Sequence, residues 1–153
     1  MDKKEIQKKV LDLIKNYKTR DPYLLVNKLG YFIQIGDLGM LPGCCIKLEG
    51  QMIIFINNDM NASMKKVVVA HELGHVILHS DNYPFNSHTK YDRDLIEAEA
   101  HIFAAELLIS DELIKDHSDY TIKQLSKLTG YAEWLIEFKK YGYTFPTKDK
   151  SVL

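Results

Sequence analysis

The sequence predicts an α+β fold in which a small mixed or antiparallel sheet packs on one central helix, with further helices before and after it. Three observations lead to this prediction. Apolar residues recur at helical spacing over 3–30, short apolar runs lie between glycine-containing turns over 31–60, and helical spacing returns from residue 61 onward. Strand patterns confined to one region, rather than alternating with helices, are typical of the α+β class.

The composition is that of one ordinary globular domain. The chain has 153 residues, of which 46% are hydrophobic and 27% charged, and its formal net charge is -1. A charge this small gives no strong field that would attract nucleic acid or an anionic membrane. The first turns of the chain carry lysine and aspartate through their apolar positions, unlike a signal peptide, and no segment reaches the ~18 consecutive apolar residues of a membrane span.

The chain contains two cysteines, Cys44 and Cys45, which are adjacent in the sequence. This spacing disfavours a disulfide between them, and no other cysteine could complete one. We therefore expect a protein of the reducing cytoplasm that has no membrane partner.

Two helices are predicted at the N-terminus. The first covers residues 3–18 and has a lysine-rich outer face. Its apolar positions at helical spacing are Ile6, Val10, Leu13 and Ile14. The second lies in the sequence DPYLLVNKLG, where Asp21 suits the N-cap, Pro22 the first helical position and Gly30 the end of the helix.

Three strands are predicted next, in the sequences YFIQIG, CCIKLEG and QMIIFIN. The last two meet at the turn sequence EGQ, which predicts an antiparallel hairpin. Because side chains alternate across a strand, at most one of Cys44 and Cys45 faces the core. A structural role is expected for both.

The central helix carries the motif HELGH, which predicts a metal site. Its His71 and His75 are four residues apart, so both imidazoles project from one helical face and can bind a single Zn²⁺. Glu72 is rotated by about 100° from His71, which sets it beside the metal as a general base. Gly74 indicates the close approach of another segment. The alternative is a helix whose histidines are hydrogen-bonded in the interior.

A catalytic zinc site usually has three protein ligands and one open position. Asp81 would be the third ligand in the aspartate variant of HExxHxxGxxH, but that pattern needs a glycine at position 78, which is a leucine. The other source is the downstream helix DLIEAEAHIFAAELLI. There Glu97 falls inside the edge of the apolar face, whereas Glu99 falls toward solvent. Glu97 is therefore the predicted third ligand, and the alanines of this helix predict close packing on the HELGH helix.

Together these motifs resemble the signature of the ImmA/IrrE family of zinc metallo-endopeptidases. The matching sequences are VVVAHELGHVILH and IEAEAHIFAAELLIS, and the sequence LPG before the strand pair is similar as well. The resemblance implies a zincin-like fold, zinc ligands at His71, His75 and Glu97, and a catalytic glutamate at Glu72.

The resemblance also implies a partner. In the branch of the family carried by phages and mobile elements, members resemble proteases that cut a helix-turn-helix repressor encoded beside them. This chain is similar to that branch in its small size. The sequence departs from the family pattern at His101, where asparagine or aspartate is usual, and at Ser110, where proline is usual.

Two points stay open at the level of sequence. The side chain that stabilises the oxyanion could be Tyr83, His88, Tyr91 or His101. The first three of these lie in the polar stretch 81–94, which is expected to be a loop. His79, four residues after the motif, is expected to be an exposed or capping residue.

Near the C-terminus, two short helices are predicted around the sequence TGY. The second, AEWLIEFKK, mixes glutamate with lysine and has no cluster of arginine, asparagine or glutamine to contact bases, so we expect no direct nucleic acid binding. Trp134 and Phe138 are expected to be core residues. The helix pair is expected either to pack the domain or to dock a substrate.

The sequence thus predicts a single metallopeptidase-like domain over 1–153. Its expected parts are N-terminal helices at 1–30, the sheet at 31–60, the metal-site helices at 61–110 and a C-terminal helical part at 111–145. The expected function is a zinc-dependent endopeptidase of narrow specificity that cleaves a helix-turn-helix repressor of a phage or mobile element. The alternative is a non-catalytic regulator that binds a repressor and has a structural metal site.

Overall fold

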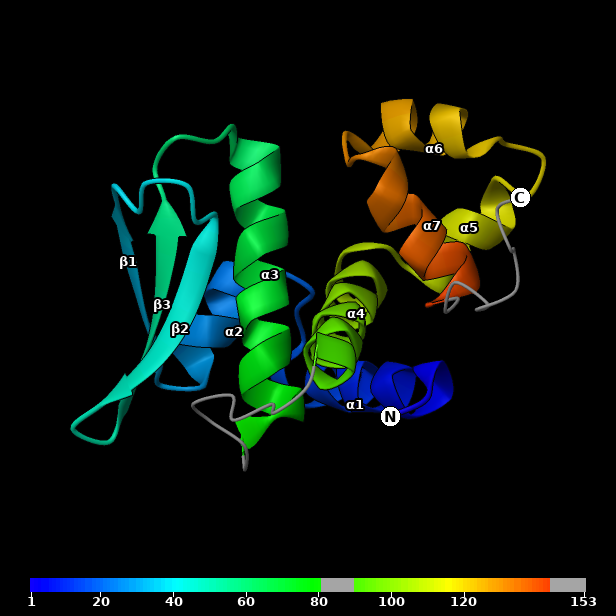
Figure 1. Cartoon of the computed structure of the whole chain (residues 1–153). Helices are drawn as coiled ribbons and strands as arrows, with labels where there is room; N and C mark the ends of the chain where they lie inside the picture. The colour runs from blue at the N-terminus through cyan, green and yellow to red at the C-terminus, as the bar shows by residue number, and fades with distance from the viewer. Residues whose placement is uncertain (81–89, 144–153) are drawn as a thin grey trace, which may run out of the picture.

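The computed structural model describes residues 1–80 and 90–143, and the fold is the predicted α+β class. Figure 1 shows the sheet on one side of α3 and the other long helix, α4, on the opposite side. The elements in chain order are α1 (Lys3–Tyr17), α2 (Pro22–Lys28), β1 (Phe32–Gly36), β2 (Gly43–Leu48), β3 (Gln51–Asn57), α3 (Ala62–Leu78), α4 (Lys90–Leu108), α5 (Asp111–Asp116), α6 (Ile122–Thr129) and α7 (Glu133–Tyr141).

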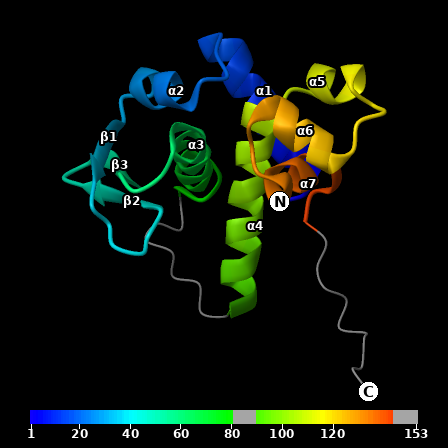
Figure 2. The same ribbon diagram turned by 90° about the horizontal axis from the view of Figure 1, so that it is seen from above.

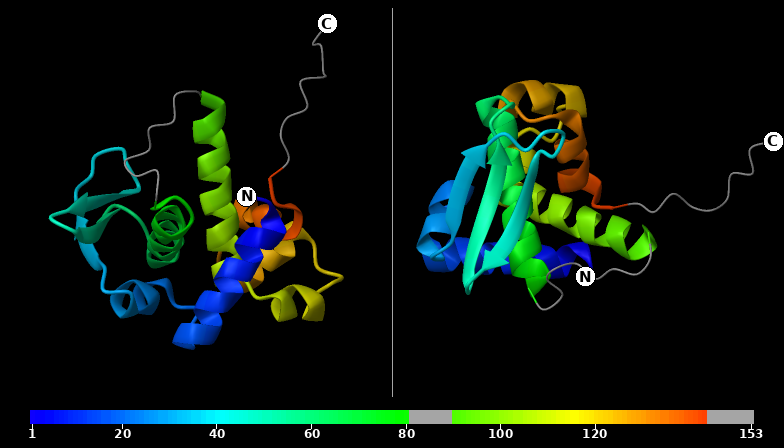
Figure 3. Two further views of the ribbon diagram at one scale, coloured as in Figure 1. Left: turned by 90° about the horizontal axis from the view of Figure 1, so that it is seen from below. Right: turned by 60° about the vertical axis from the view of Figure 1, so that its left-hand side comes forward.

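The sheet is mixed and has the strand order β1-β3-β2. β1 pairs in parallel with β3, and β2 pairs antiparallel with β3, so the predicted hairpin is confirmed. Ile54 and Ile56 of β3 are fully buried, as is most of the neighbouring Cys45 of β2. Because alternate residues of a strand point to the same face, these side chains form one face of the sheet, and this face packs on α3. In the right-hand view of Figure 3, α3 lies behind the sheet.

α3 is the central helix, and it is covered by the sheet on one side and by α4 on the other (Figure 2). Asn61 caps its N-terminus by accepting a hydrogen bond from the backbone N–H of Met64 at 2.8 Å. A Cβ built at Gly74 would lie 3.1 Å from the ring of Phe103 on α4. The close approach predicted from this glycine is therefore confirmed, and it brings α3 and α4 near enough to share a site.

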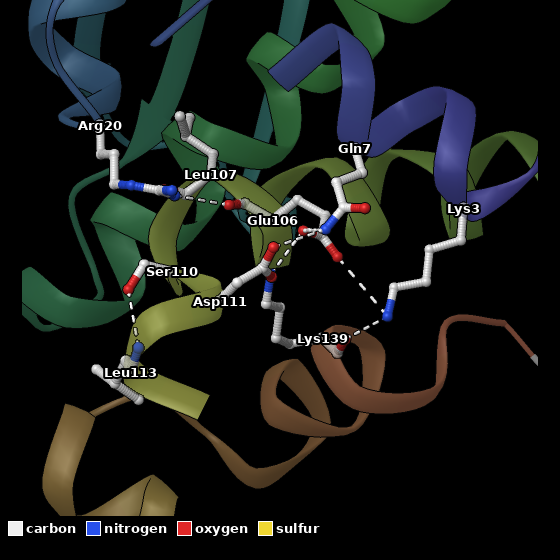
Figure 4. A network of polar contacts seen from close by, with 9 residues as sticks. All are labelled: Lys3, Gln7, Arg20, Glu106, Leu107, Ser110, Asp111, Leu113 and Lys139. Carbon is white, nitrogen blue, oxygen red and sulfur yellow. Dashed lines mark hydrogen bonds and ion pairs between the residues drawn. The ribbon is translucent and has the colours of Figure 1, made fainter. Parts of the chain in front are cut away.

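A buried ion pair joins the helices on the far side of α4. The Lys139 ammonium of α7 donates to Glu106 Oε2 of α4 at 2.6 Å, and both side chains are almost fully buried. Lys3 of α1 lies 3.7 Å from the other oxygen of Glu106, and Gln7 donates to Glu106 at 3.3 Å. Figure 4 shows these side chains converging from three helices. The network, which also includes Asp111, fixes α1 and α7 against α4.

One boundary prediction was wrong. The stretch 81–94 was expected to be a loop because it is polar, but α4 begins at Lys90. Residues Asp92 to Asp94 are exposed, so a polar sequence there is the solvent-facing first part of a helix. The pair of helices predicted around TGY is confirmed, with Gly130 ending α6 at φ +76°, a conformation that glycine adopts without strain.

Within the described residues, none of the helices is both long and apolar enough to cross a membrane.

Candidate metal centre

The side chains of His71, His75 and Glu97 meet between α3 and α4. The two Nε2 atoms of the histidines are 3.0 Å apart. Glu97 places Oε2 3.1 Å from Nε2 of His71 and Oε1 3.3 Å from Nε2 of His75. Ligands that bind zinc tetrahedrally at about 2.0–2.1 Å are about 3.3 Å from one another. The three residues singled out from the sequence therefore present one nitrogen or oxygen each, all within 4.8 Å of one another.

The donor set fits a zinc ion by its chemistry as well as by its spacing. Two imidazoles and one carboxylate are a common set in catalytic zinc sites, which leave a further position for water. Hydrogen bonds from His71 and His75 hold the pKa of Glu97 well below the usual range of a glutamate. Glu97 is thus a carboxylate at neutral pH, which is the form that binds a metal.

Glu72 lies beside this cluster and faces the strand β2. Its side chain is buried, and a Cβ built at Gly43 would lie 3.3 Å from its Cγ. Burial raises the pKa of Glu72 above the usual value, while the neighbouring His71 and His75 and a hydrogen bond from Cys45 oppose this effect. A carboxylate with a raised pKa accepts a proton more readily, which suits a general base.

The predicted orientation of Glu99 was wrong. Glu99 is 5% exposed, and it accepts hydrogen bonds from Nε2 of His79 at 2.7 Å and from the N-terminal ammonium of Met1. The prediction assumed that only one face of α4 is buried. In the structure, α4 is covered by α3 on one side and also by α1. His79 was expected to be exposed or capping. It is the C-cap residue of α3, but it is buried against Glu99 rather than exposed.

The side chains of His71, His75 and Glu97 line a pocket of about 530 Å³. The polar part of its lining consists of His71, Glu72, His75, Glu97 and His101. The rest of the lining is mostly apolar and consists of Leu41, Pro42, Gly43, Cys44, Cys45, Met64, Val67, Val68 and Trp134. Such a pocket suits an apolar group held next to a polar reaction centre.

The sequence did not identify the residues of the apolar lining. Trp134 was expected in the core, but it is half-buried and lines the pocket. Its spacing from Phe138 indicated only that both lie on one helical face. The residues of β2 reach the pocket because the sheet packs on α3, and no local pattern carries that information.

Only one of the four oxyanion candidates can be placed. Tyr83 and His88 lie outside the described residues, and so does the side chain of Tyr91, although its backbone is part of α4. His101 lines the pocket, with its ring centroid 4.4 Å from that of His71. Burial and the nearby charge of His71 lower the pKa of His101 to about 4, so it is neutral at pH 7.

Gly43→Ala is expected to lower the free energy of unfolding by about 1–3 kcal/mol. The new Cβ would lie 2.6 Å from Cγ1 of Val68 and 3.0 Å from the backbone oxygen of Phe55, so β2 and α3 must move apart. Urea denaturation measures the change. Gly36→Ala is the matched control, because a Cβ there meets nothing within 4 Å. Equal stability of the two variants would contradict the packing described for β2.

The chain is similar to known proteins over most of its length. Residues 38–133 match a peptidase family model described as the IrrE N-terminal-like domain. "Uncharacterized immunity region protein 2" of Bacillus phage phi105 is 31% identical over 139 residues, which is 88% of this chain and 88% of that protein. "Metallopeptidase ImmA" of Bacillus subtilis (strain 168) is 31% identical over 121 residues, which is 76% of this chain and 70% of that protein.

Proposed function

The chain belongs to the ImmA/IrrE family of metallopeptidases, and we propose that it is a zinc-dependent endopeptidase of narrow specificity. The observation that carries this proposal is the convergence of Nε2 of His71, Nε2 of His75 and the carboxylate of Glu97 on one point. In the proposal these three residues bind zinc. Glu72, which is buried beside them, is the catalytic residue.

When bound, zinc supplies Lewis-acid chemistry, because it polarises the scissile carbonyl and makes a water acidic enough to lose a proton near neutral pH. Glu72 accepts that proton as the water oxygen attacks the carbonyl carbon. It then gives the proton to the amine nitrogen as the peptide C–N bond breaks. The raised pKa of Glu72 supports both steps, since the group must take up a proton and release it again.

The proposed substrate is a helix-turn-helix repressor encoded by a phage or mobile element. Two findings support this choice. One relative is named as an immunity region protein of a phage, and another as the metallopeptidase ImmA. The pocket at His71, His75 and Glu97 also has a largely apolar lining, which favours a substrate with a large apolar side chain near the scissile bond.

The test is incubation of the purified chain with the repressor encoded beside its own gene. We expect one cleavage in the presence of zinc, none in excess chelator, and recovery when zinc is added back. Unfolded casein is the control for specificity and should stay uncut. Cleavage that persists in chelator after the metal has been removed would refute a zinc mechanism.

Glu97→Ala is expected to weaken zinc binding by more than about 100-fold, because it removes a ligand. Loss of a residue that only supports a ligand typically weakens metal binding by about 10–100-fold. The side chain of Glu97 is 55% exposed, so the metal-free protein should keep its melting temperature. Glu99→Ala is the matched control two residues away. It should bind zinc normally but melt at a lower temperature, because Glu99 is buried and pairs with the N-terminal ammonium of Met1. Competition with a chromogenic chelator and thermal melts measure both quantities, and the reverse pattern would exclude Glu97 as a ligand.

A further inference from the structure

An imidazole that binds a metal through one nitrogen leaves the other nitrogen to be satisfied by the protein. In histidine sites this second nitrogen nearly always donates its hydrogen to a neighbouring group, which fixes the ring. Nε2 of His71 points to the cluster with His75 and Glu97. Nδ1 of His71 is buried and has no hydrogen-bond partner among the residues that the structure describes.

The ring of His101 is a close neighbour of the His71 ring. His101 follows Glu97 by one turn of α4, so both side chains project toward α3. Its ring is tilted by 40° from that of His71, with the centroids 4.4 Å apart. Nδ1 of His101 is also buried and lacks a hydrogen-bond partner in the described part of the chain. Two neighbouring rings thus each have a buried nitrogen that needs a partner.

The helix α7 holds the ring of His101 in this position. Trp134 and Phe138 are one turn apart on α7, and the centroid of each ring is 5.0 Å from that of His101. His101 is therefore enclosed between α3 and α7. No hydrogen bond joins the two Nδ1 atoms in the described part of the chain, so forming one requires the imidazoles to turn.

We infer that His101 is a positioning residue for the metal ligand His71, and that its Nδ1 accepts a hydrogen bond from Nδ1–H of His71. The inference rests on the proposed zinc site. With Nε2 of His71 on the metal, the hydrogen of this ring is on Nδ1, so His71 donates. His101 must then carry its own hydrogen on Nε2.

The role differs from mere packing in one respect. If Nδ1 of His101 accepts a hydrogen bond, an asparagine at this position can replace it, because its carbonyl oxygen is also an acceptor. A leucine fills similar space but accepts nothing. A packing role predicts the opposite order, since leucine is the better apolar filler beside Trp134 and Phe138.

The test compares the zinc dissociation constants of the wild type, His101→Leu and His101→Asn by chelator competition. We expect His101→Leu to bind zinc 10–100-fold more weakly and His101→Asn to regain most of the affinity. Equal affinity of wild type and His101→Leu would overturn the inference, and so would equal weakness of the two variants. If the wild type itself binds no zinc, the proposed function fails as well, so the two failures are distinguishable.

A second measurement needs no variant. Long-range ¹H–¹⁵N spectra of the zinc-loaded wild type report which nitrogen of each histidine carries the hydrogen. We expect the hydrogen on Nδ1 of His71 and on Nε2 of His101. A hydrogen on Nδ1 of His101 would overturn the inference, even if a variant fails to fold.

Discussion

Glu72→Gln is expected to reduce peptide cleavage by about 10²–10⁴-fold, the contribution typical of general acid–base catalysis, while zinc affinity stays near that of the wild type. Glutamine has nearly the same shape, but its neutral amide cannot take a proton from the attacking water. Glu72 contributes no atom to the cluster of His71, His75 and Glu97, so the metal should remain bound. Single-turnover cleavage of the repressor and chelator competition measure the two quantities.

The matched control is Glu133→Gln, which removes an exposed carboxylate from the first turn of α7. It should leave both cleavage and zinc affinity unchanged. If Glu72→Gln cleaves at the wild-type rate, Glu72 is not the base. If wild type and variant are equally inactive but bind the repressor equally well, the chain is a non-catalytic regulator, which was the alternative considered from the sequence.

Features whose geometry depends only on neighbouring residues could be predicted from the sequence. The spacing of His71 and His75 places both on one face of whichever helix contains them. The helical phase of Glu97 relative to the apolar face was enough to distinguish it from Glu99 as the residue that meets these histidines. The strand hairpin was predictable for the same reason, since its turn and its alternation lie within one short segment.

The same phase argument failed for Glu99, and the reason is physical. Helical phase compares residues on one helix, but burial depends on what covers each face. α4 is covered by α1 and α7 as well as by α3. The apolar face that packs on α3 placed Glu99 on the solvent side, but in the structure another helix buries that side.

Contacts between distant segments were beyond reach of the sequence. Gly43 and Cys45 of β2 meet Glu72 because the sheet packs on α3. Lys139 meets Glu106 across a separation of 33 residues. In the sequence, Lys139 is one charge in a short helix of mixed charge, and nothing local distinguishes it from the less buried Lys140 beside it.

Lys139→Met is expected to lower the free energy of unfolding by about 3–5 kcal/mol, the cost of leaving one partner of a buried ion pair uncompensated. The remaining charge of Glu106 would stay buried, with Lys3 at 3.7 Å and Gln7 at 3.3 Å as its weaker partners. Such a loss is a large part of the 5–15 kcal/mol that stabilises a typical domain. Urea denaturation in excess chelator measures it without a contribution from metal binding.

Two further variants distinguish the loss of the ion pair from a general effect of placing methionine in α7. Lys140→Met changes the next residue of α7, which is only partly buried, and should alter stability by no more than about 0.5 kcal/mol. Adding Glu106→Leu to Lys139→Met removes the buried charge together with its partner. Because apolar replacement of a whole buried pair is often neutral or stabilising, the double variant should be more stable than Lys139→Met alone. A double variant that is less stable than Lys139→Met would mean that Glu106 keeps a stabilising role through its remaining contacts with Lys3 and Gln7, which would contradict an uncompensated buried charge.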